Sequence, residues 1–395
     1  MEHSITIKRI AAAVFVIILF VGFIKSGSFS QLTTLSSFLA KSKDDQSTID
    51  AIESNFSNNL SYKEDLVNLN GAISKKLKMK ALYSDIGIYV SQDNYIISPG
   101  AQTSTDYEYE QITSLYQFLK QNGINLLYVN QPVKYIDDSY LLTEFGLKSY
   151  SNQNADVFLK RIDEAGIPYL DLRENIKAEN INTPDLFYRT DHHWTTRAGF
   201  WATRHIVESM NDKLGYNIDT GLYDLSNYEV REWKNCWLGE QGKKISQSYI
   251  GLDDYTAIKP TFLTSYTFPT ADGNTINGTF DTFINENVYN LENDVYANPS
   301  WHYSYSAKSC TNNNVQYGKV LLLDDSYAMV TEPFLSLGVN HIDVVTMRDT
   351  NDSFSLRQLI IDNKYDTVLI CYAQFMIGAH DNPSSANYKM FTFDK

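Results

Sequence analysis

Short apolar runs alternate with longer amphipathic segments in the first half of the chain. In residues 106–121 apolar side chains recur every three or four positions, which predicts a helix, and the apolar run 124–130 after it predicts a buried strand. The same order returns with a helix predicted at 153–165 and a strand at 168–172. Helices that alternate with buried strands cover both faces of a parallel sheet, so the pattern predicts an α/β fold with crossover helices.

The alternation continues toward the C-terminus, where the apolar runs are the strongest in the chain. The predicted strands there are 320–323, 342–345 and 367–372, and the predicted helices are 329–337 and 357–363. These segments extend the same parallel sheet.

Three other regions complete the predicted organisation. Residues 49–77 favour amphipathic helices, 86–97 favour a β-hairpin, and 196–214 favour a helix capped by Thr195 or Thr196. Residues 215–315 are rich in Tyr, Asn, Thr and Gly and show no clear period. We interpret them as an insertion of short strands and loops within the domain.

The N-terminal region carries an unbroken apolar stretch, residues 10–24, directly after Lys8 and Arg9. A membrane-spanning helix needs roughly 17–25 residues, and the preceding apolar residues can extend this one. A cleaved signal peptide is the alternative, but the small-residue cleavage site that it requires is missing. We therefore expect an uncleaved anchor, and the basic flank places the N-terminus in the cytoplasm and the remaining chain outside.

The chain accordingly divides into three predicted parts. Residues 1–28 form the membrane anchor, residues 29–48 a Ser- and Thr-rich linker, and residues 49–395 the catalytic domain with the insertion at 215–315. With 395 residues, of which 43% are apolar, the chain is long enough for one large hydrophobic core.

Composition narrows the set of partners. The 33 basic and 47 acidic residues give a net charge of −14, which argues against a nucleic-acid partner. The 28 Tyr residues suit a surface that stacks on sugar rings, or simply a Tyr-rich core. The three cysteines give no disulfide framework, although Cys236 and Cys310 could pair outside the cell. No Cys or His spacing indicates a metal site, and we expect no cofactor.

Two short motifs carry the candidate chemistry. Asp191, His192, His193 and Trp194 are consecutive, and Ser326 follows the predicted strand 320–323 in a later segment. A serine becomes nucleophilic at neutral pH when an imidazole takes its proton and a carboxylate orients that imidazole. Two residues apart in a turn, the Asp191 carboxylate can reach the His193 ring, with His192 facing the other way.

Each of these residues also has a structural interpretation. Ser326 or Asp325 could simply cap the predicted helix that follows, which is a common role for Ser and Asp. His192 could be a packed side chain, and the two adjacent histidines raise the alternative of a metal site, although no third ligand has convincing spacing. The carboxyl edge of a parallel sheet is where ligands bind, and the Ser326 N–H there could help stabilise an oxyanion.

The motifs resemble those of a known family. Residues 190–195, residues 324–328, the Pro-Val-Lys sequence at 132–134 and the late strand 364–372 are similar to the DHHW proteins, an SGNH-hydrolase-like branch related to the alginate O-acetyltransferases. The resemblance covers roughly residues 50–380. It implies an SGNH-like (flavodoxin-like) parallel sheet in which the Asp-x-His motif precedes the Ser, the reverse of ordinary SGNH hydrolases.

The resemblance also implies residue roles. Ser326 would be the nucleophile, His193 the base and Asp191 the group that orients the base. Asp324 stands where the family usually has Gly, which adds a negative charge beside the nucleophile. The remaining candidates for oxyanion or substrate binding are Tyr327, Asn130, Arg348, Tyr372 and Gln374.

The expected function is that of a membrane-anchored extracytoplasmic O-acetyltransferase, which modifies a cell-surface or secreted polysaccharide through an acyl-serine. The resemblance implies a multispanning membrane acyltransferase as the acetyl donor. A carbohydrate acetylesterase with the same triad is the first alternative. A non-catalytic glycan-binding or scaffold protein of a polysaccharide export complex is the second.

Overall fold

The computed structural model describes residues 63–80, 87–137, 146–284, 309–378 and 386–394. The chain divides into two compact units, Met1–Lys78 with Lys244–Tyr249, and Met79–Lys243 with Ile250–Lys395. The predicted anchor and linker lie outside the described residues, as do residues 49–62. Among the helices that are described, none combines the length and the apolar character that crossing a membrane requires.

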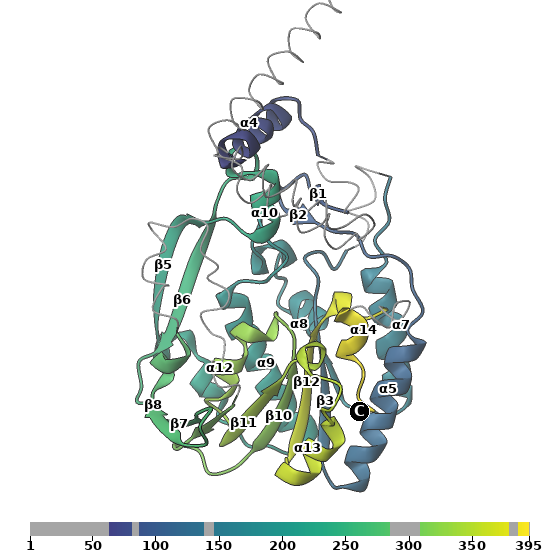
Figure 1. Cartoon of the computed structure of the whole chain (residues 1–395), viewed down its shortest axis with the longest axis vertical. Coiled ribbons are helices and arrows are strands. Elements are labelled where there is room, and N and C mark those ends of the chain that lie inside the picture. The colour runs from purple at the N-terminus through teal and green to yellow at the C-terminus, as the bar shows by residue number, and fades with distance from the viewer. Residues whose placement is uncertain (1–62, 81–86, 138–145, 285–308, 379–385, 395) are drawn as a thin grey trace, which may run out of the picture. The chain divides into compact units, whose positions relative to one another are not determined.

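A mixed eight-stranded sheet forms the centre of the larger unit (Figure 1). The strands lie in the order β4 (Tyr169–Asp171), β3 (Asn125–Gln131), β12 (Thr367–Ala373), β10 (Lys319–Asp324), β11 (His341–Val345), β9 (Ser309–Asn312), β7 (Tyr266–Pro269) and β8 (Thr275–Gly278). Neighbours from β4 to β11 are parallel, and the last three strands add antiparallel pairs. The predicted parallel α/β core is thus confirmed.

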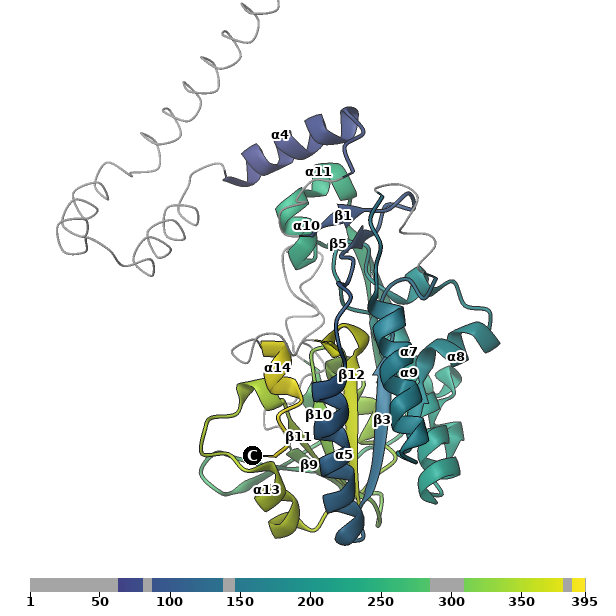
Figure 2. The same cartoon turned by 90° about the vertical axis from the view of Figure 1, so that its right-hand side faces the viewer.

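Helices cover both faces of the sheet, as the two views in Figures 1 and 2 show. One face packs α8 (Leu172–Ala178), α9 (Thr196–Leu214) and α12 (Glu332–Leu335), and the other packs α5 (Asp106–Gln121), α7 (Ser151–Glu164), α13 (Leu356–Asn363) and α14 (Ala386–Met390). Strand β10 explains the division, because successive side chains point to opposite faces. Val320 and Leu322 enter the first core cluster, whereas Leu321 and Leu323 enter the second.

Local sequence signals set several of these boundaries. The Thr195 hydroxyl caps α9 by accepting the Ala198 N–H at 3.2 Å, as expected. The helix predicted at 329–337 is instead two short pieces, η8 (Ala328–Val330) and α12. Pro333 lacks the N–H that a continuous helix would use there, which explains the break.

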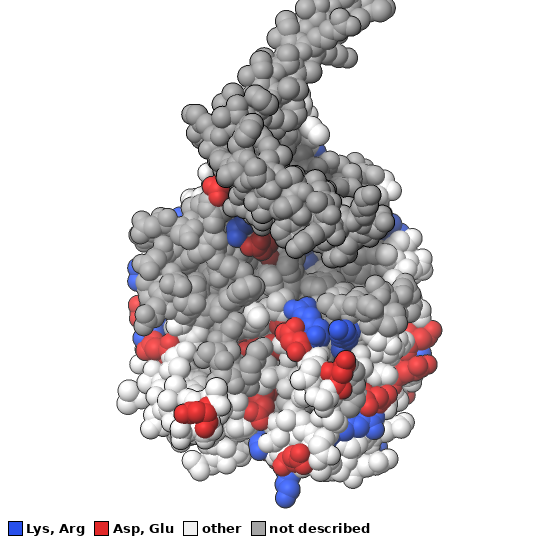
Figure 3. Space-filling model, in the orientation of Figure 1, with Lys and Arg blue, Asp and Glu red and all other residues white. Residues whose placement is uncertain are grey.

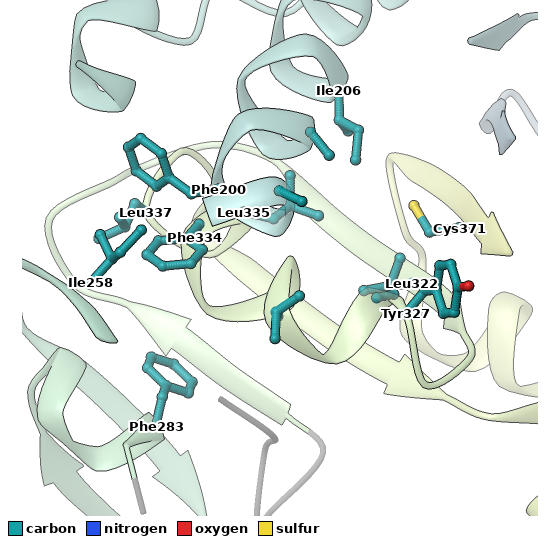
Figure 4. Packing of buried hydrophobic residues seen from close by; sticks show 14 of the residues in the cluster. Phe200, Ile206, Ile258, Phe283, Leu322, Tyr327, Phe334, Leu335, Leu337 and Cys371 are labelled. Carbon is teal, nitrogen blue, oxygen red and sulfur yellow. The ribbon is translucent and has the colours of Figure 1, made fainter. Parts of the chain in front are cut away.

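The prediction of an irregular insertion is wrong in part. Strands β5 (Tyr228–Trp237) and β6 (Asp253–Pro260) form a long antiparallel ribbon, with α10 (Glu240–Ile245) and α11 (Gln247–Ile250) between them in sequence. The insertion also supplies β7, β8 and β9 to the central sheet. Figure 4 shows its Ile258 and Phe283 in the same core cluster as Phe200 and Phe334.

The remaining described elements are short. They are β1 (Tyr89–Val90) and β2 (Ile96–Ile97), which form the predicted hairpin, and the 3-10 turns η2 (Thr183–Leu186), η3 (Thr220–Tyr223), η4 (Leu225–Asn227), η5 (Phe280–Phe283), η9 (Met347–Asp349) and η10 (Gln374–Met376). In the smaller unit, α4 (Lys63–Lys76) confirms the later part of the predicted N-terminal helices.

The possible disulfide between Cys236 and Cys310 is not formed. Both thiols are free and buried, as is Cys371. Cys236 lies in the β5–β6 ribbon and Cys310 in the central sheet, so each fills the core as a small apolar side chain.

Candidate active site

The Asp-His-His motif lies in a tight turn before α9. Phe187 and Trp194 form an antiparallel bridge, and the Tyr188 N–H donates to the His193 carbonyl at 3.1 Å. The chain therefore folds back on itself over residues 189–192 and brings the Asp191 and His193 side chains to one side.

Asp191 and His193 form the contact that their spacing predicts. Nδ1 of His193 donates to Asp191 Oδ1 at 2.6 Å, and the His193 N–H donates to the same oxygen at 3.1 Å. Burial alone would raise the pKa of the Asp191 carboxyl, but the hydrogen bonds and the electrostatic interaction with His193 hold that pKa well below its usual range. An ionised Asp191 therefore fixes the tautomer of His193 in which Nε2 is free to accept a proton.

His192 does not face away from the pair, contrary to the sequence prediction. Its Nδ1 lies 3.2 Å from Asp191 Oδ1, and its ring centroid lies 4.0 Å from that of His193. The side chain of His192 is 42% exposed and that of His193 only 12%. Burial and the neighbouring His193 lower the pKa of His192 to about 4, so the ring is neutral at physiological pH.

A second chain segment clamps Asp191 from the other side. The Glu240 N–H donates to Asp191 Oδ2 at 2.7 Å, and the Gly239 N–H donates to the Thr190 hydroxyl at 2.7 Å. A Cβ at Gly239 would lie 2.5 Å from the Asp191 Cβ, so only glycine permits this close approach. Both carboxylate oxygens of Asp191 are thus occupied by fixed donors.

Asp253, at the start of β6, secures the residues just before Asp191. Its carboxylate accepts the N–H groups of Arg189 and Thr190, each at 2.9 Å, and the Thr190 hydroxyl at 2.5 Å. Neither Asp253 nor Gly239 was predicted from the sequence. The one available signal was the Leu-Gly-Glu-Gln-Gly sequence at 238–242, since closely spaced glycines often mark a close backbone approach.

Lys134, from the Pro-Val-Lys sequence, holds the motif from a third direction. Its Nζ donates to the Asp191 carbonyl at 2.7 Å and to the Ile96 carbonyl at 2.8 Å. Burial lowers the pKa of Lys134 to about 7, although the charges of Asp253 and Asp191 oppose that shift. Among the described residues, no carboxylate lies within ion-pair distance of Lys134.

Ser326 lies at the carboxyl end of β10, in the turn that leads to η8, and is half-buried. The preceding Asp325 fixes this turn, because its carboxylate accepts the Tyr327 N–H at 2.9 Å and the Ala373 N–H at 2.6 Å. Burial raises the pKa of Asp325 to about 6. Asp324 is also buried and accepts the Thr346 hydroxyl at 2.5 Å, so its charge points into the core beside β11.

Tyr327 joins the serine turn to the histidine turn. Its carbonyl accepts the Trp194 indole N–H at 2.7 Å, and its hydroxyl donates to the His192 carbonyl at 2.6 Å. Ser326 directly precedes Tyr327, and His193 lies between His192 and Trp194, so both are adjacent in sequence to residues of these two hydrogen bonds. The predicted hydrogen bond between Ser326 Oγ and His193 is nevertheless not formed, since Nε2 of His193 is buried without a hydrogen-bond partner.

The five other candidate residues separate into four groups. Tyr372 is turned away, because its hydroxyl donates to the Met390 carbonyl at 2.8 Å within the second core cluster. Asn130 and Gln374 belong to a buried network, in which the Asn130 amide donates to Asp171 Oδ1 at 2.9 Å. Tyr327 is committed to the link described above. Arg348 remains; its positive charge lowers the pKa of His192, though less than burial does, and opposes the rise that burial causes in the pKa of Asp325.

A cleft of about 360 Å³ opens beside the turn. His192, Tyr327 and Phe375 form one wall, and residues 96–100 with Lys134 form another. The lining combines apolar and aromatic groups with a few polar ones, as ligand sites do. Ser326 and His193 do not line the cleft themselves and lie next in sequence to Tyr327 and His192, which do.

Asp191, His192 and His193 also form a group that could hold a metal ion, with ligand atoms within 4.8 Å of one another. The sequence prediction of no metal counted only the two histidines and lacked a third ligand, which Asp191 supplies by geometry. A cation there would compete with the short Asp191–His193 hydrogen bond, so the donor set fits a proton relay better than a resident metal.

Comparison with solved structures defines the class of the domain. PatB1 of Bacillus cereus matches with a TM-score of 0.62 and 20% identity over 78% of this chain and 99% of that chain. A DHHW family protein of Eubacterium siraeum matches with a TM-score of 0.54 and 16% identity over 74% and 91% of the two chains. The fold is therefore SGNH-like, as the motifs predicted. Among curated proteins, none matches.

Comparison with protein families is more specific. Residues 89–232 match the family described as SGNH hydrolase-like domain, acetyltransferase AlgX. Over residues 89–232 the chain is thus similar to the SGNH hydrolase-like domain of an acetyltransferase family. The matched segment includes Asp191 and His193 and ends before Ser326.

Proposed function

We propose that this protein is an O-acetyltransferase of the polysaccharide-modifying type, with Ser326 as nucleophile, His193 as general base and Asp191 as the residue that orients His193. The observation that carries the proposal is the buried Asp191–His193 hydrogen bond of 2.6 Å, which leaves Nε2 of His193 without a partner. The Trp194–Tyr327 hydrogen bond, which joins the turn that carries His193 to the turn that carries Ser326, supports this assignment. The match to an acetyltransferase family supports the reaction class.

In the first half-reaction the Ser326 oxygen attacks the carbonyl carbon of an acetyl donor, and its proton passes to Nε2 of His193. Asp191 stabilises the imidazolium that forms. The tetrahedral intermediate collapses to an acetyl-serine, and His193 returns the proton to the leaving oxygen. The bond from Ser326 Oγ to Nε2 is expected to form when substrate binds, since such contacts are often looser in unliganded enzymes.

In the second half-reaction a sugar hydroxyl replaces the donor. His193 takes the hydroxyl proton while the sugar oxygen attacks the acetyl carbonyl, and Ser326 leaves with that proton. Water at the same step would give a carbohydrate acetylesterase, which is the second candidate function. The apolar and aromatic wall of the cleft, with Tyr327 and Phe375, favours a sugar ring over bulk water as the occupant.

We further propose that the domain lies outside the cytoplasmic membrane, held by the anchor predicted at residues 1–28. In that setting acetyl groups reach Ser326 from a multispanning membrane acyltransferase, and the acceptor is a cell-surface or secreted polysaccharide. On the face shown in Figure 3, the described Lys and Arg side chains are interspersed with Asp and Glu, without the continuous basic surface that a nucleic acid would need.

Turnover of a chromogenic acetate, with and without a panel of oligosaccharide acceptors, tests the proposal. The transferase is expected to release the chromophore faster with its acceptor and to yield acetylated sugar. Release that stays independent of every sugar, with free acetate as the sole product, would favour the esterase. A scaffold protein would neither hydrolyse the chromogenic acetate nor acetylate a sugar, and Ser326→Ala would leave its glycan binding unchanged.

The proposed location outside the membrane has a separate test. Protease added to intact cells should remove the domain while an N-terminal tag stays protected. A mature chain that begins near Ser28 would show that the apolar segment is a cleaved signal instead.

A further inference from the structure

Helix α4 presents an apolar stripe to solvent. Leu69, Ile73 and Leu77 recur every four residues and are 54%, 50% and 66% exposed. Leu77 directly follows the helix and continues it, with its N–H donating to the Ile73 carbonyl at 2.9 Å. Residues four apart share one face, so the three side chains form a continuous ridge.

The opposite side of α4 is packed. Gly71 is buried, and a Cβ there would lie 1.7 Å from the Ser246 hydroxyl, which belongs to the same compact unit. At 100° per residue, Ile73 points about 200° away from Gly71. The ridge therefore faces away from the contact that already holds the helix.

Positive charge gathers at the C-terminal end of α4. Lys75, Lys76 and Lys78 are all exposed, in a chain whose net charge is −14. The charge of this cluster is opposite in sign to the net charge of the chain. An anionic lipid surface binds helices that combine apolar side chains with nearby lysines. The apolar groups enter the region between headgroups and acyl chains, and the ammonium groups contact the phosphates.

We propose that α4 docks on an anionic lipid surface through the ridge of Leu69, Ile73 and Leu77, with Lys76 beside the ridge and Lys75 and Lys78 at the same end of the helix. A second copy of the chain is a poorer occupant, because it would bring the same positive charge. The apolar stretch at residues 10–24, part of the proposed membrane anchor, precedes α4 by 38 residues, and this part of the argument rests on that proposed anchor. The proposal is independent of the chemistry at Ser326.

An environment-sensitive fluorophore on Ile73→Cys in the full chain tests this docking. The three native cysteines are buried, so the new thiol is the one that reacts. The protein is reconstituted into uncharged phosphatidylcholine vesicles and into vesicles that also contain phosphatidylglycerol. The emission is expected to shift to the blue with phosphatidylglycerol and to return at high salt. Lys75→Gln, Lys76→Gln and Lys78→Gln together should reduce the docked fraction about tenfold or more.

Leu263→Cys provides the matched control, because Leu263 is an apolar residue that is 95% exposed and lies outside α4. Its fluorophore should report water in both vesicle types. Equal emission from position 73 in the two vesicle types would overturn the proposal. So would blue emission in both vesicle types that high salt leaves unchanged, which would mean that the apolar side chains are covered without any role for the lysine charges.

Discussion

The two sides of the candidate site differ in how completely their polar groups are fixed. On the histidine side, Asp191 accepts donors from His193, Glu240 and Lys134 at its two carboxylate oxygens and its carbonyl. On the serine side, Nε2 of His193 has no partner and Ser326 stays half-buried. In the proposed function the base and its orienting carboxylate are thus preorganised, and we expect the nucleophile to complete the site when substrate binds. Preorganised dipoles need no rearrangement at the moment of reaction, which is where enzymes gain most.

Removal of the nucleophile or the base should give the largest effect, because it abolishes proton transfer on both sides of the site. Ser326→Ala and His193→Ala should each lower acetyl-ester turnover on the order of 10³-fold or more, and the double variant should cost little beyond that. Steady-state kinetics on the purified variants measures this. Additive losses would mean that the two residues do not act as a unit.

Asp191→Asn should come next, with turnover reduced on the order of 10²-fold or more. An Asn side chain has only one oxygen, so it cannot accept hydrogen bonds from both the Glu240 N–H and the His193 Nδ1–H as the carboxylate does. The tautomer of His193 is then no longer fixed. Near-ultraviolet circular dichroism should stay native. Unchanged turnover would show that the short Asp191–His193 bond is structural alone.

Gly239→Ala tests the contact of residues 239–240 with Thr190 and Asp191 without changing a catalytic side chain. The added methyl group must displace Asp191 or the 239–240 backbone, which should cost about 1–3 kcal/mol of stability and roughly tenfold in turnover. Gly221→Ala serves as the control, because its Cβ would meet the exposed Asp219 side chain at 3.0 Å and nothing in the site. An equal loss in both variants would mean that the clamp has no special role.

Lys134→Met should change the pH dependence of stability. The folded pKa of about 7 lies below the ordinary value of 10.5, so the folded state releases this proton first and the wild-type protein gains stability as pH rises between those values. The slope can reach about 1.4 kcal/mol per pH unit and should be absent in Lys134→Met. Urea unfolding at several pH values from neutral to alkaline follows it. Identical slopes would place the charge of Lys134 in solvent rather than beneath Asp191.

His192→Ala should have the smallest effect, below about threefold in turnover, despite its position beside Asp191. Its pKa of about 4 keeps it neutral, so its loss removes part of the cleft wall but no charge. If His192→Ala lowered turnover as much as His193→Ala at unchanged stability, either His192 would be the general base or the two histidines would hold a metal ion.

Much of the structure followed from local sequence patterns, and the failures have a common physical cause. The Asp191–His193 contact and the α9 cap involve residues at most three positions apart, so spacing alone predicted them. Glu240 and Asp191 are 49 positions apart, and no local period encodes such a contact. Strands β7 to β9 were missed as sheet members because each has only 4 residues, too few to establish an alternation, although β7 and β9 do alternate in burial. Pro333 was visible in the sequence and should have divided the helix predicted at 329–337.

The central claim is that Ser326, in the turn after β10, is acylated by an acetyl donor while the His193 imidazole, which Asp191 orients, takes the serine proton. Incubating the protein with a small acetyl ester, quenching with acid and mapping the acetyl group by peptide mass spectrometry tests it directly. The acetyl group should appear on Ser326, and it should be absent from the same peptide in the His193→Ala protein. An acetyl group on another residue, or full turnover with Ser326 never labelled, would contradict the account.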